Sequence, residues 1–158
     1  MIPEIDKIKD IVVNAHNILI IQADNPDGDS LGSALALEAI LGDMGKNPSM
    51  YCGVSMPDYL KFLNGWDRVQ KTIPNKIDAS IIVDTSAKIL LEQLEKEQGL
   101  PWVASKPVIV LDHHTDVPCD IPYATVVCNG EHSVSTGELI YDIAKALEWP
   151  LSVTTQEF

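Results

Sequence analysis

The chain has 158 residues, of which 11 are Lys or Arg and 23 are Asp or Glu, so its formal net charge is −12. This charge argues against a broad basic face for long duplex DNA. No stretch is apolar for long enough to span a bilayer, and the N-terminus lacks the basic and apolar blocks of a signal peptide. The length fits one domain with a hydrophobic core.

The first part of the chain predicts a helix, a strand and a second helix. Residues 4–16 place apolar side chains at helical spacing, so we expect an amphipathic helix there. Residues 17–23 are apolar enough for a buried strand, and an acidic turn follows at residues 24–30. A helix is expected over residues 31–44, because Gly45 is suited to end it. Together they form the first half of a βαβ unit.

The middle of the chain predicts shorter elements. A second strand is expected at residues 49–53, a short helix at residues 57–63 and a short edge strand at residues 68–71. Residues 79–83 are again apolar and predict a buried strand, and residues 88–98 predict a helix that Gly99 ends.

The last part begins with four apolar residues, 108–111, which predict a buried parallel strand. Another strand is expected at residues 124–128, and a helix at residues 135–147. Strands alternate with helices along the chain. The sequence therefore predicts an α/β fold, with a doubly wound and mainly parallel sheet and helices on both faces.

Acidic and imidazole side chains follow three of these strands. They are Asp27 and Asp29 after the first, Asp84 after the strand at 79–83, and Asp112, His113 and His114 after the strand at 108–111. The carboxyl ends of parallel strands meet at one edge of a sheet, so these side chains should converge. Carboxylates so close together would repel one another, and divalent cations remove that conflict. Two ions held in this way suit in-line attack on phosphorus.

An ordinary turn is the alternative for residues 25–29, which also contain turn and helix-cap residue types. The two histidines could likewise belong to a polar turn after a strand and form ordinary hydrogen bonds without binding a metal ion. The turn is neither a Walker loop nor a dinucleotide fingerprint, because Gly-Lys-Ser/Thr and GxGxxG are both absent.

Several motifs together resemble those of the DHH phosphoesterases. Residues 25–33 read Asn-Pro-Asp-Gly-Asp-Ser-Leu-Gly-Ser, residues 83–86 read Val-Asp-Thr-Ser, and residues 111–114 read Leu-Asp-His-His. Residues 135–139, Ser-Thr-Gly-Glu-Leu, resemble the helix start that follows in the family. The branch that these motifs most resemble contains nanoRNases and phosphoadenosine-phosphate phosphatases.

The resemblance implies a hydrolase that depends on Mn²⁺ or Mg²⁺, with two ions, and acts on short oligonucleotides or a 3′-phosphorylated nucleotide. By position in the motifs, Asp27 would bind one ion and Asp29 the other, Asp84 would bridge both, and His113 would bind the second.

The resemblance also implies roles beside the ions. His114 and Asn25 would contact the substrate, and His114 would also help to protonate the leaving group. Asp112 would orient the histidines in this catalytic pair.

Two departures from the family pattern stand out. Ala23 occupies the position of a family histidine, so the first ion would lose an imidazole, and Gln22, Asp24 or water would have to fill the gap. The fourth motif and the C-terminal substrate-binding domain are not found before Phe158, so we expect residues 1–158 to be a DHH domain truncated ahead of both.

These departures leave two other functions to consider. One is a degenerate DHH domain that binds nucleotides or another protein, and the other is a family II inorganic pyrophosphatase, whose motifs differ more in wording. We expect no membrane partner, leave a homodimer open, and expect a cytoplasmic location. The location follows from Cys52, Cys119 and Cys128, which are widely spaced and form no CxxC pair.

Overall fold

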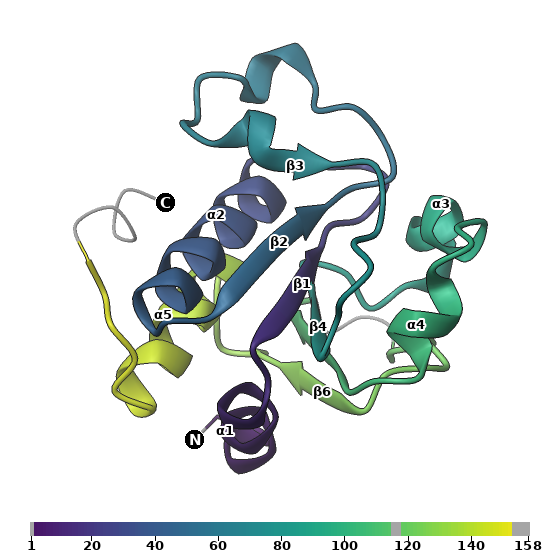
Figure 1. Ribbon diagram of the computed structural model, residues 1–158. Helices are drawn as coiled ribbons and strands as arrows, with labels where there is room; N and C mark the ends of the chain where they lie inside the picture. The colour runs from purple at the N-terminus through teal and green to yellow at the C-terminus, as the bar shows by residue number, and fades with distance from the viewer. Residues whose placement is uncertain (1, 115–117, 153–158) are drawn as a thin grey trace.

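The computed structural model describes residues 2–114 and 118–152; the predicted domain end at Phe158 lies outside them. Six strands form one sheet in the order β3-β2-β1-β4-β5-β6, and every neighbouring pair is parallel (Figure 1). The strands are β1 Asn17–Ile21, β2 Asn47–Tyr51, β3 Val69–Gln70, β4 Ala79–Val83, β5 Val108–Asp112 and β6 Val126–Asn129. The predicted doubly wound α/β fold is confirmed.

Helices cover both faces of the sheet, as Figure 1 shows. The α-helices are α1 Ile5–Asn14, α2 Gly28–Asp43, α3 Glu92–Glu95, α4 Leu100–Ala104 and α5 Thr136–Ala146. The 3-10 turns are η1 Asp58–Leu60, η2 Trp66–Arg68 and η3 Lys88–Leu91. Helices α1, α2 and α5 share one apolar core with the sheet, and the segment from η3 to α4 shares the other.

The alternation of side chains along β1 builds these two cores. Ile18 and Ile20 pack into the core beneath α2, whereas Leu19 and Ile21 pack into the opposite core. A strand that is covered on both faces must be apolar throughout, which explains the unbroken apolar runs in the sequence.

The prediction of one continuous helix at residues 88–98 is wrong. The chain instead makes η3 and the short α3, and then α4, which the sequence did not predict. Asp24 accepts a hydrogen bond from the Gln93 backbone at 3.1 Å, and the Leu90 carbonyl accepts one from the Asp24 backbone at 2.8 Å. These long-range bonds hold the segment in short turns, and Pro101 in the first turn of α4 restarts the helix.

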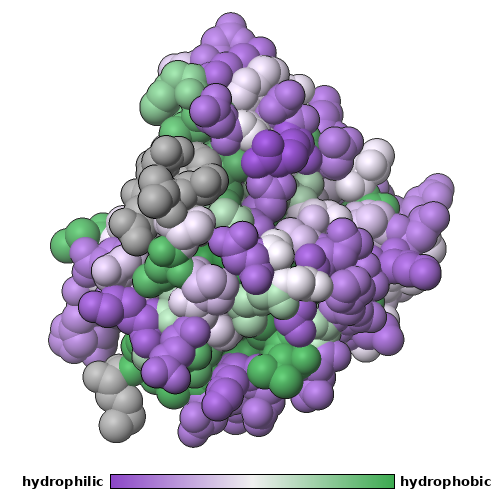
Figure 2. Space-filling model, turned by 60° about the vertical axis from the view of Figure 1, so that its left-hand side comes forward, coloured by the Kyte–Doolittle hydropathy of each residue, from purple (hydrophilic) through white to green (hydrophobic). Residues whose placement is uncertain are grey.

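Other predicted bounds shift by a few residues. The helix expected at 31–44 begins earlier, at Gly28, because Asp27 serves as its N-cap. The strand expected at 124–128 is observed as Val126–Asn129. Hydrophilic residues cover most of the face seen in Figure 2, with hydrophobic residues in small separate groups. Within the described ranges, no helix combines the length and the apolar character needed to cross a bilayer.

The strand register explains where a site can form. Ile21 pairs with Ile82, and Val83 pairs with Leu111. Continuing that register past the strand ends puts Ala23, Asp84 and Asp112 in one row across three adjacent strands. The row lies where β1 and β4 adjoin in the middle of the strand order, which is the position where ligands bind in open α/β sheets.

Candidate metal centre

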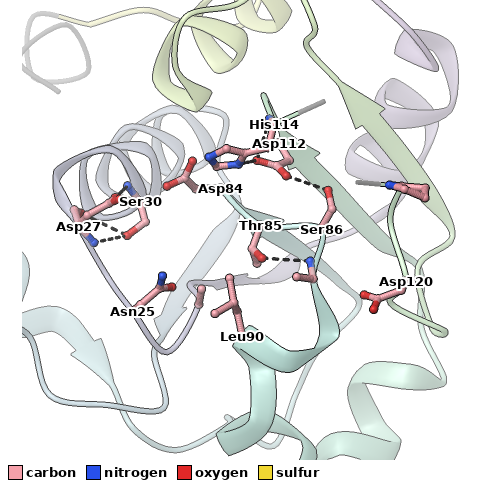
Figure 3. A pocket seen from close by; sticks show the side chains of 13 residues that line it. Asn25, Asp27, Ser30, Asp84, Thr85, Ser86, Leu90, Asp112, His114 and Asp120 are labelled. Carbon is pink, nitrogen blue, oxygen red and sulfur yellow. Dashed lines mark hydrogen bonds and ion pairs between the residues drawn. The ribbon is translucent and has the colours of Figure 1, made fainter. Parts of the chain in front are cut away.

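A pocket of about 280 Å³ opens at the carboxyl edge of β1, β4 and β5 (Figure 3). Most of its lining is polar: Asn25, Asp27, Ser30, Asp84, Thr85, Ser86, Asp112, His114 and Asp120. Four apolar residues complete it: Ala23, Ala87, Leu90 and Pro118. The pocket therefore joins residues from three strand ends that are far apart in the sequence.

Four side chains at this edge form a compact group of ligand types. One ligand atom each from Asp84, Asp112, His113 and His114 lie within 4.8 Å of one another. Carboxylate oxygen and imidazole nitrogen suit divalent ions such as Mn²⁺ or Zn²⁺. The donor set is therefore chemically suited to a divalent metal ion.

Asp84 contributes a carboxylate to this group. Its φ of 65° is in the left-handed region, an unusual conformation that aspartate tolerates better than most residues. Its Oδ1 accepts a hydrogen bond from Thr136 Oγ1 at 2.9 Å and lies 3.5 Å from His113 Nε2. Burial, followed by the nearby charge of Asp29, raises the pKa of Asp84 to about 8. A cation beside Asp84 would stabilise its ionised form and so lower this pKa.

Asp112 is buried, and protein donors occupy both of its oxygens. Oδ1 accepts hydrogen bonds from the His113 and His114 backbones and contacts His114 Nδ1 at 2.5 Å, and Oδ2 accepts one from Ser86 Oγ at 2.9 Å. These contacts hold Asp112 against the His114 ring and against the backbones of both histidines. The side chain of His114 is 55% exposed and faces the pocket.

Asp27 and Asp29 each hold the start of a helix, and both lie outside the compact group. Asp27 Oδ1 accepts a hydrogen bond from the Ser30 backbone at the start of α2. Asp29 accepts hydrogen bonds from the Thr136 and Gly137 backbones at the start of α5, at 3.0 and 3.1 Å. Its Oδ2 still lies 3.5 Å from His113 Nε2, so Asp29 adjoins the group through that histidine.

Comparison with known proteins identifies the family. Residues 17–157 match the N-terminal domain of the DHH family. The chain belongs to the DHH family. DHH domains are typically metal-dependent phosphoesterases, and the group of Asp84, Asp112 and two histidines is a possible metal site in this one.

One solved structure shows the same fold at low sequence identity. It is the crystal structure of an exopolyphosphatase-related protein from Bacteroides fragilis, with a TM-score of 0.79 and 22% identity. The alignment covers 93% of this chain but 45% of that protein, so this DHH domain spans less than half its length. A search of curated proteins found no match to the sequence.

Ala23 lines the pocket of this DHH domain with a methyl group, and neither neighbour replaces an imidazole there. Gln22 is fully buried beneath α2, where its Oε1 accepts a hydrogen bond from Ser30 Oγ at 3.0 Å. Asp24 is directed towards the Gln93 backbone. Of the residues expected to contact substrate, Asn25 and His114 both line the pocket.

Several residues of the site did not emerge from the sequence. Thr136 donates to Asp84, and Ser86 donates to Asp112. Both belong to stretches that resemble family motifs, so the motifs marked their neighbourhood without giving their contacts. Leu90 and Asp120 also line the pocket, and both lie outside the stretches that resemble family motifs.

Proposed function

We propose that this DHH domain is part of a phosphoesterase that uses two Mn²⁺ or Mg²⁺ ions to hydrolyse short oligonucleotides or a 3′-phosphorylated nucleotide. The observation that carries the proposal is the compact group of Asp84, Asp112, His113 and His114, three of which line a pocket of about 280 Å³. The charges of Asp29 and Asp27 both act on Asp84, which is in keeping with two ions rather than one.

When bound, such ions would polarise the phosphoryl group and offset the charge that develops on it. Asp84 Oδ1 and Asp29 Oδ2 each lie 3.5 Å from His113 Nε2, and in this proposal Asp84 would help to hold both ions. His113 would bind on the side of Asp29, 3.5 Å from that carboxylate. The crowded carboxylates would repel a phosphate if they were alone, and the positive ions reverse that local field.

His114 is positioned to handle the leaving group. Its Nδ1 is held by Asp112, which sets the ring orientation and directs Nε2 away from the carboxylate. When the ring is protonated, its Nε2–H can donate to a phosphate oxygen or to the departing oxygen. Asn25 lies across the same pocket and offers both a donor and an acceptor to the substrate.

The test is to compare hydrolysis of a dinucleotide, a 3′-phosphorylated nucleotide and pyrophosphate, each with and without Mn²⁺. We expect Mn²⁺-dependent cleavage of one or both nucleotide substrates, and loss of that cleavage in Asp84→Asn and His114→Asn. Cleavage of pyrophosphate alone would favour an inorganic pyrophosphatase and contradict the proposal.

Ala23 favours a second candidate, a DHH domain that binds nucleotides but cleaves them poorly. A methyl group there removes an imidazole from the surroundings of the first ion. Nucleotide binding without turnover, unchanged by Ala23→His, would support this candidate.

We also propose a substrate size, a cellular location and an oligomeric state for this protein. A net charge of −12 favours small substrates over long duplex DNA. All three cysteines are free, which suits a reducing cytoplasm. A homodimer is a further proposal, and sedimentation of the purified protein would test it.

A further inference from the structure

The residues that line the pocket differ in chemistry. We refer to Asp27, Asp84, Asp112 and His114 as the polar half of the lining, and to Ala23, Ala87, Leu90 and Pro118 as its apolar half. We propose, on the basis of the proposed function, that the apolar half binds the nucleoside part of the substrate, and that Asp120 recognises an amino group on its base. The site would then select nucleotides over inorganic polyphosphates.

Leu90 is the main apolar side chain of this half. In Figure 3 it rises from η3 into the pocket, between Asn25 and Asp120. Its neighbour Leu91 is 1% exposed and belongs to the core. Leu90 thus contributes its side chain to the pocket while Leu91 anchors the turn.

The backbone of Leu90 is fixed in place. Its carbonyl accepts a hydrogen bond from the Asp24 backbone at 2.8 Å, and its amide donates to the Ala87 carbonyl at 3.1 Å. The first of these bonds ties the apolar half to the turn that carries Asn25 and Asp27. The distance between the two halves of the pocket is therefore set by the fold, and little ordering is needed on binding.

Asp120 supplies a fixed acceptor at the end of the apolar half. Its Oδ1 accepts a hydrogen bond from the Lys88 backbone at 2.7 Å, and its own amide donates to the Ser86 carbonyl at 3.1 Å. Within the described part of the chain, no donor bonds its Oδ2. A carboxylate oxygen can only accept while it is ionised, so it selects a ligand group that donates, such as the exocyclic amino group of a base.

An inorganic phosphate chain matches this half poorly. Each of its units carries negative charge, which would lie against Leu90 without solvation and close to the like charge of Asp120. A nucleobase instead offers apolar faces to Leu90 and Pro118 and an N–H edge to Asp120. The apolar half of the pocket therefore fits a nucleobase better than a phosphate chain.

The first experiment needs neither metal nor phosphate. Adenosine is titrated into protein with labelled Leu and Ala methyl groups, followed by NMR, and purine riboside, which lacks the amino group, serves as the matched ligand. We expect shifts at Leu90, Ala87 and Ala23, and binding of adenosine about three- to tenfold tighter than purine riboside.

Three variants locate the binding. Leu90→Asp should lower the affinity for adenosine by at least about tenfold. The milder Leu90→Ala, which preserves the turn, should lower it severalfold. Ile89→Asp is the control, because Ile89 is 72% exposed and does not line this pocket. Asp120→Asn should abolish the preference for adenosine over purine riboside, since the amide oxygen can still accept from Lys88 while its amino group faces the ligand.

The second experiment compares pyrophosphate with adenosine 3′,5′-bisphosphate in Mn²⁺ by calorimetry. Tighter binding of the bisphosphate, lost in Leu90→Asp and kept in Ile89→Asp, supports the proposal. Equal binding of both ligands, or no adenosine shifts at the pocket methyl groups, overturns it while leaving a phosphoesterase intact. Adenosine binding at Leu90 without any Mn²⁺-dependent hydrolysis would support the nucleoside-binding proposal and contradict the proposed function.

Discussion

Ala23 is the residue where this DHH domain departs most clearly from its family pattern. Its side chain lines the pocket in the same row as Asp84, and Gln22 and Asp24 are both directed elsewhere. Losing a ligand that contacts the ion should cost more than losing one of its hydrogen-bonded supports, which costs roughly 10–100-fold. We therefore expect two ions of unequal affinity, with the ion beside His113 binding first.

Ala23→His should raise the affinity of the weaker ion by at least about tenfold. The measurement is a calorimetric Mn²⁺ titration of the wild type and the variant. Ala104→His is the control, because Ala104 is exposed on α4 and lies outside the pocket. Two equally tight ions in the wild type, with no gain from the histidine at position 23, would show that another group already fills the gap.

Asp84 predicts a pH effect on the metal-free domain. Burial, and then the charge of Asp29, raises the pKa of Asp84 from 3.8 to about 8, with the charge of Asp27 contributing less. Between these two values the folded chain holds a proton that the unfolded chain releases. The stability due to this group is therefore fully present below about pH 4 and is lost as the pH rises through about 8.

Urea unfolding in EDTA, from about pH 5 to about pH 9, measures this effect. The free energy of unfolding should fall with rising pH in the wild type and fall less in Asp84→Asn, which has no charge to develop. His113, Asp27 and Asp29 face the same site and remain in both proteins, so the difference between the two profiles reports Asp84. Parallel profiles would refute the assignment.

Asp29 joins α2 to α5. It accepts hydrogen bonds from two backbone amides at the start of α5, where an anion is also favoured by the helix dipole. Asp29→Ala should lower the free energy of unfolding by about 1–3 kcal/mol even without metal, because those amides lose their partners. Asp43→Ala, at the exposed far end of α2, removes the same charge and should change stability by less than about 0.5 kcal/mol. Chemical denaturation compares them, and equal losses would contradict the role of Asp29.

The sheet could be predicted because its strands are marked locally. β1, β4 and β5 are apolar runs followed by polar turns, and parallel pairing then brings Asp84 beside Asp112. The division of the segment from η3 to α4 into short turns could not be predicted. It depends on hydrogen bonds with Asp24, which lies 69 residues before Gln93 in the sequence. Local patterns carry no information about such partners.

The same limit applies to the candidate site. Helix-cap residue types at 25–29 were compatible with the cap that Asp27 forms on α2, but no local pattern showed that Asp29 would accept hydrogen bonds from the start of α5. The partner of Asp29 in α5, Thr136, is 107 residues away. The apolar half of the pocket was missed because Leu90 reads as an ordinary helix residue until η3 turns it into the pocket.

The complete fold assembles one site from three strand ends that are distant in the sequence. The solved structure shares this architecture over 93% of the chain, and the alignment covers 45% of that protein. The described domain already contains the candidate metal group, so metal binding should be measurable in this protein without additional partners. Each ion bound only by the folded state would stabilise it by mass action.

Thermal unfolding at a series of Mn²⁺ concentrations measures whether the folded chain binds metal at this edge of the sheet. At about 100 times the dissociation constant, the folded state should gain about 2.7 kcal/mol, which raises the Tm by about 5–10 °C for a domain of this size. Asp84→Ala should remove this gain more completely than Asp29→Ala, whereas Asp67→Ala, an exposed acid on η2, should retain it. A Tm that does not change with Mn²⁺ in the wild type, or a gain that persists in Asp84→Ala, would contradict a metal centre at this edge of the sheet.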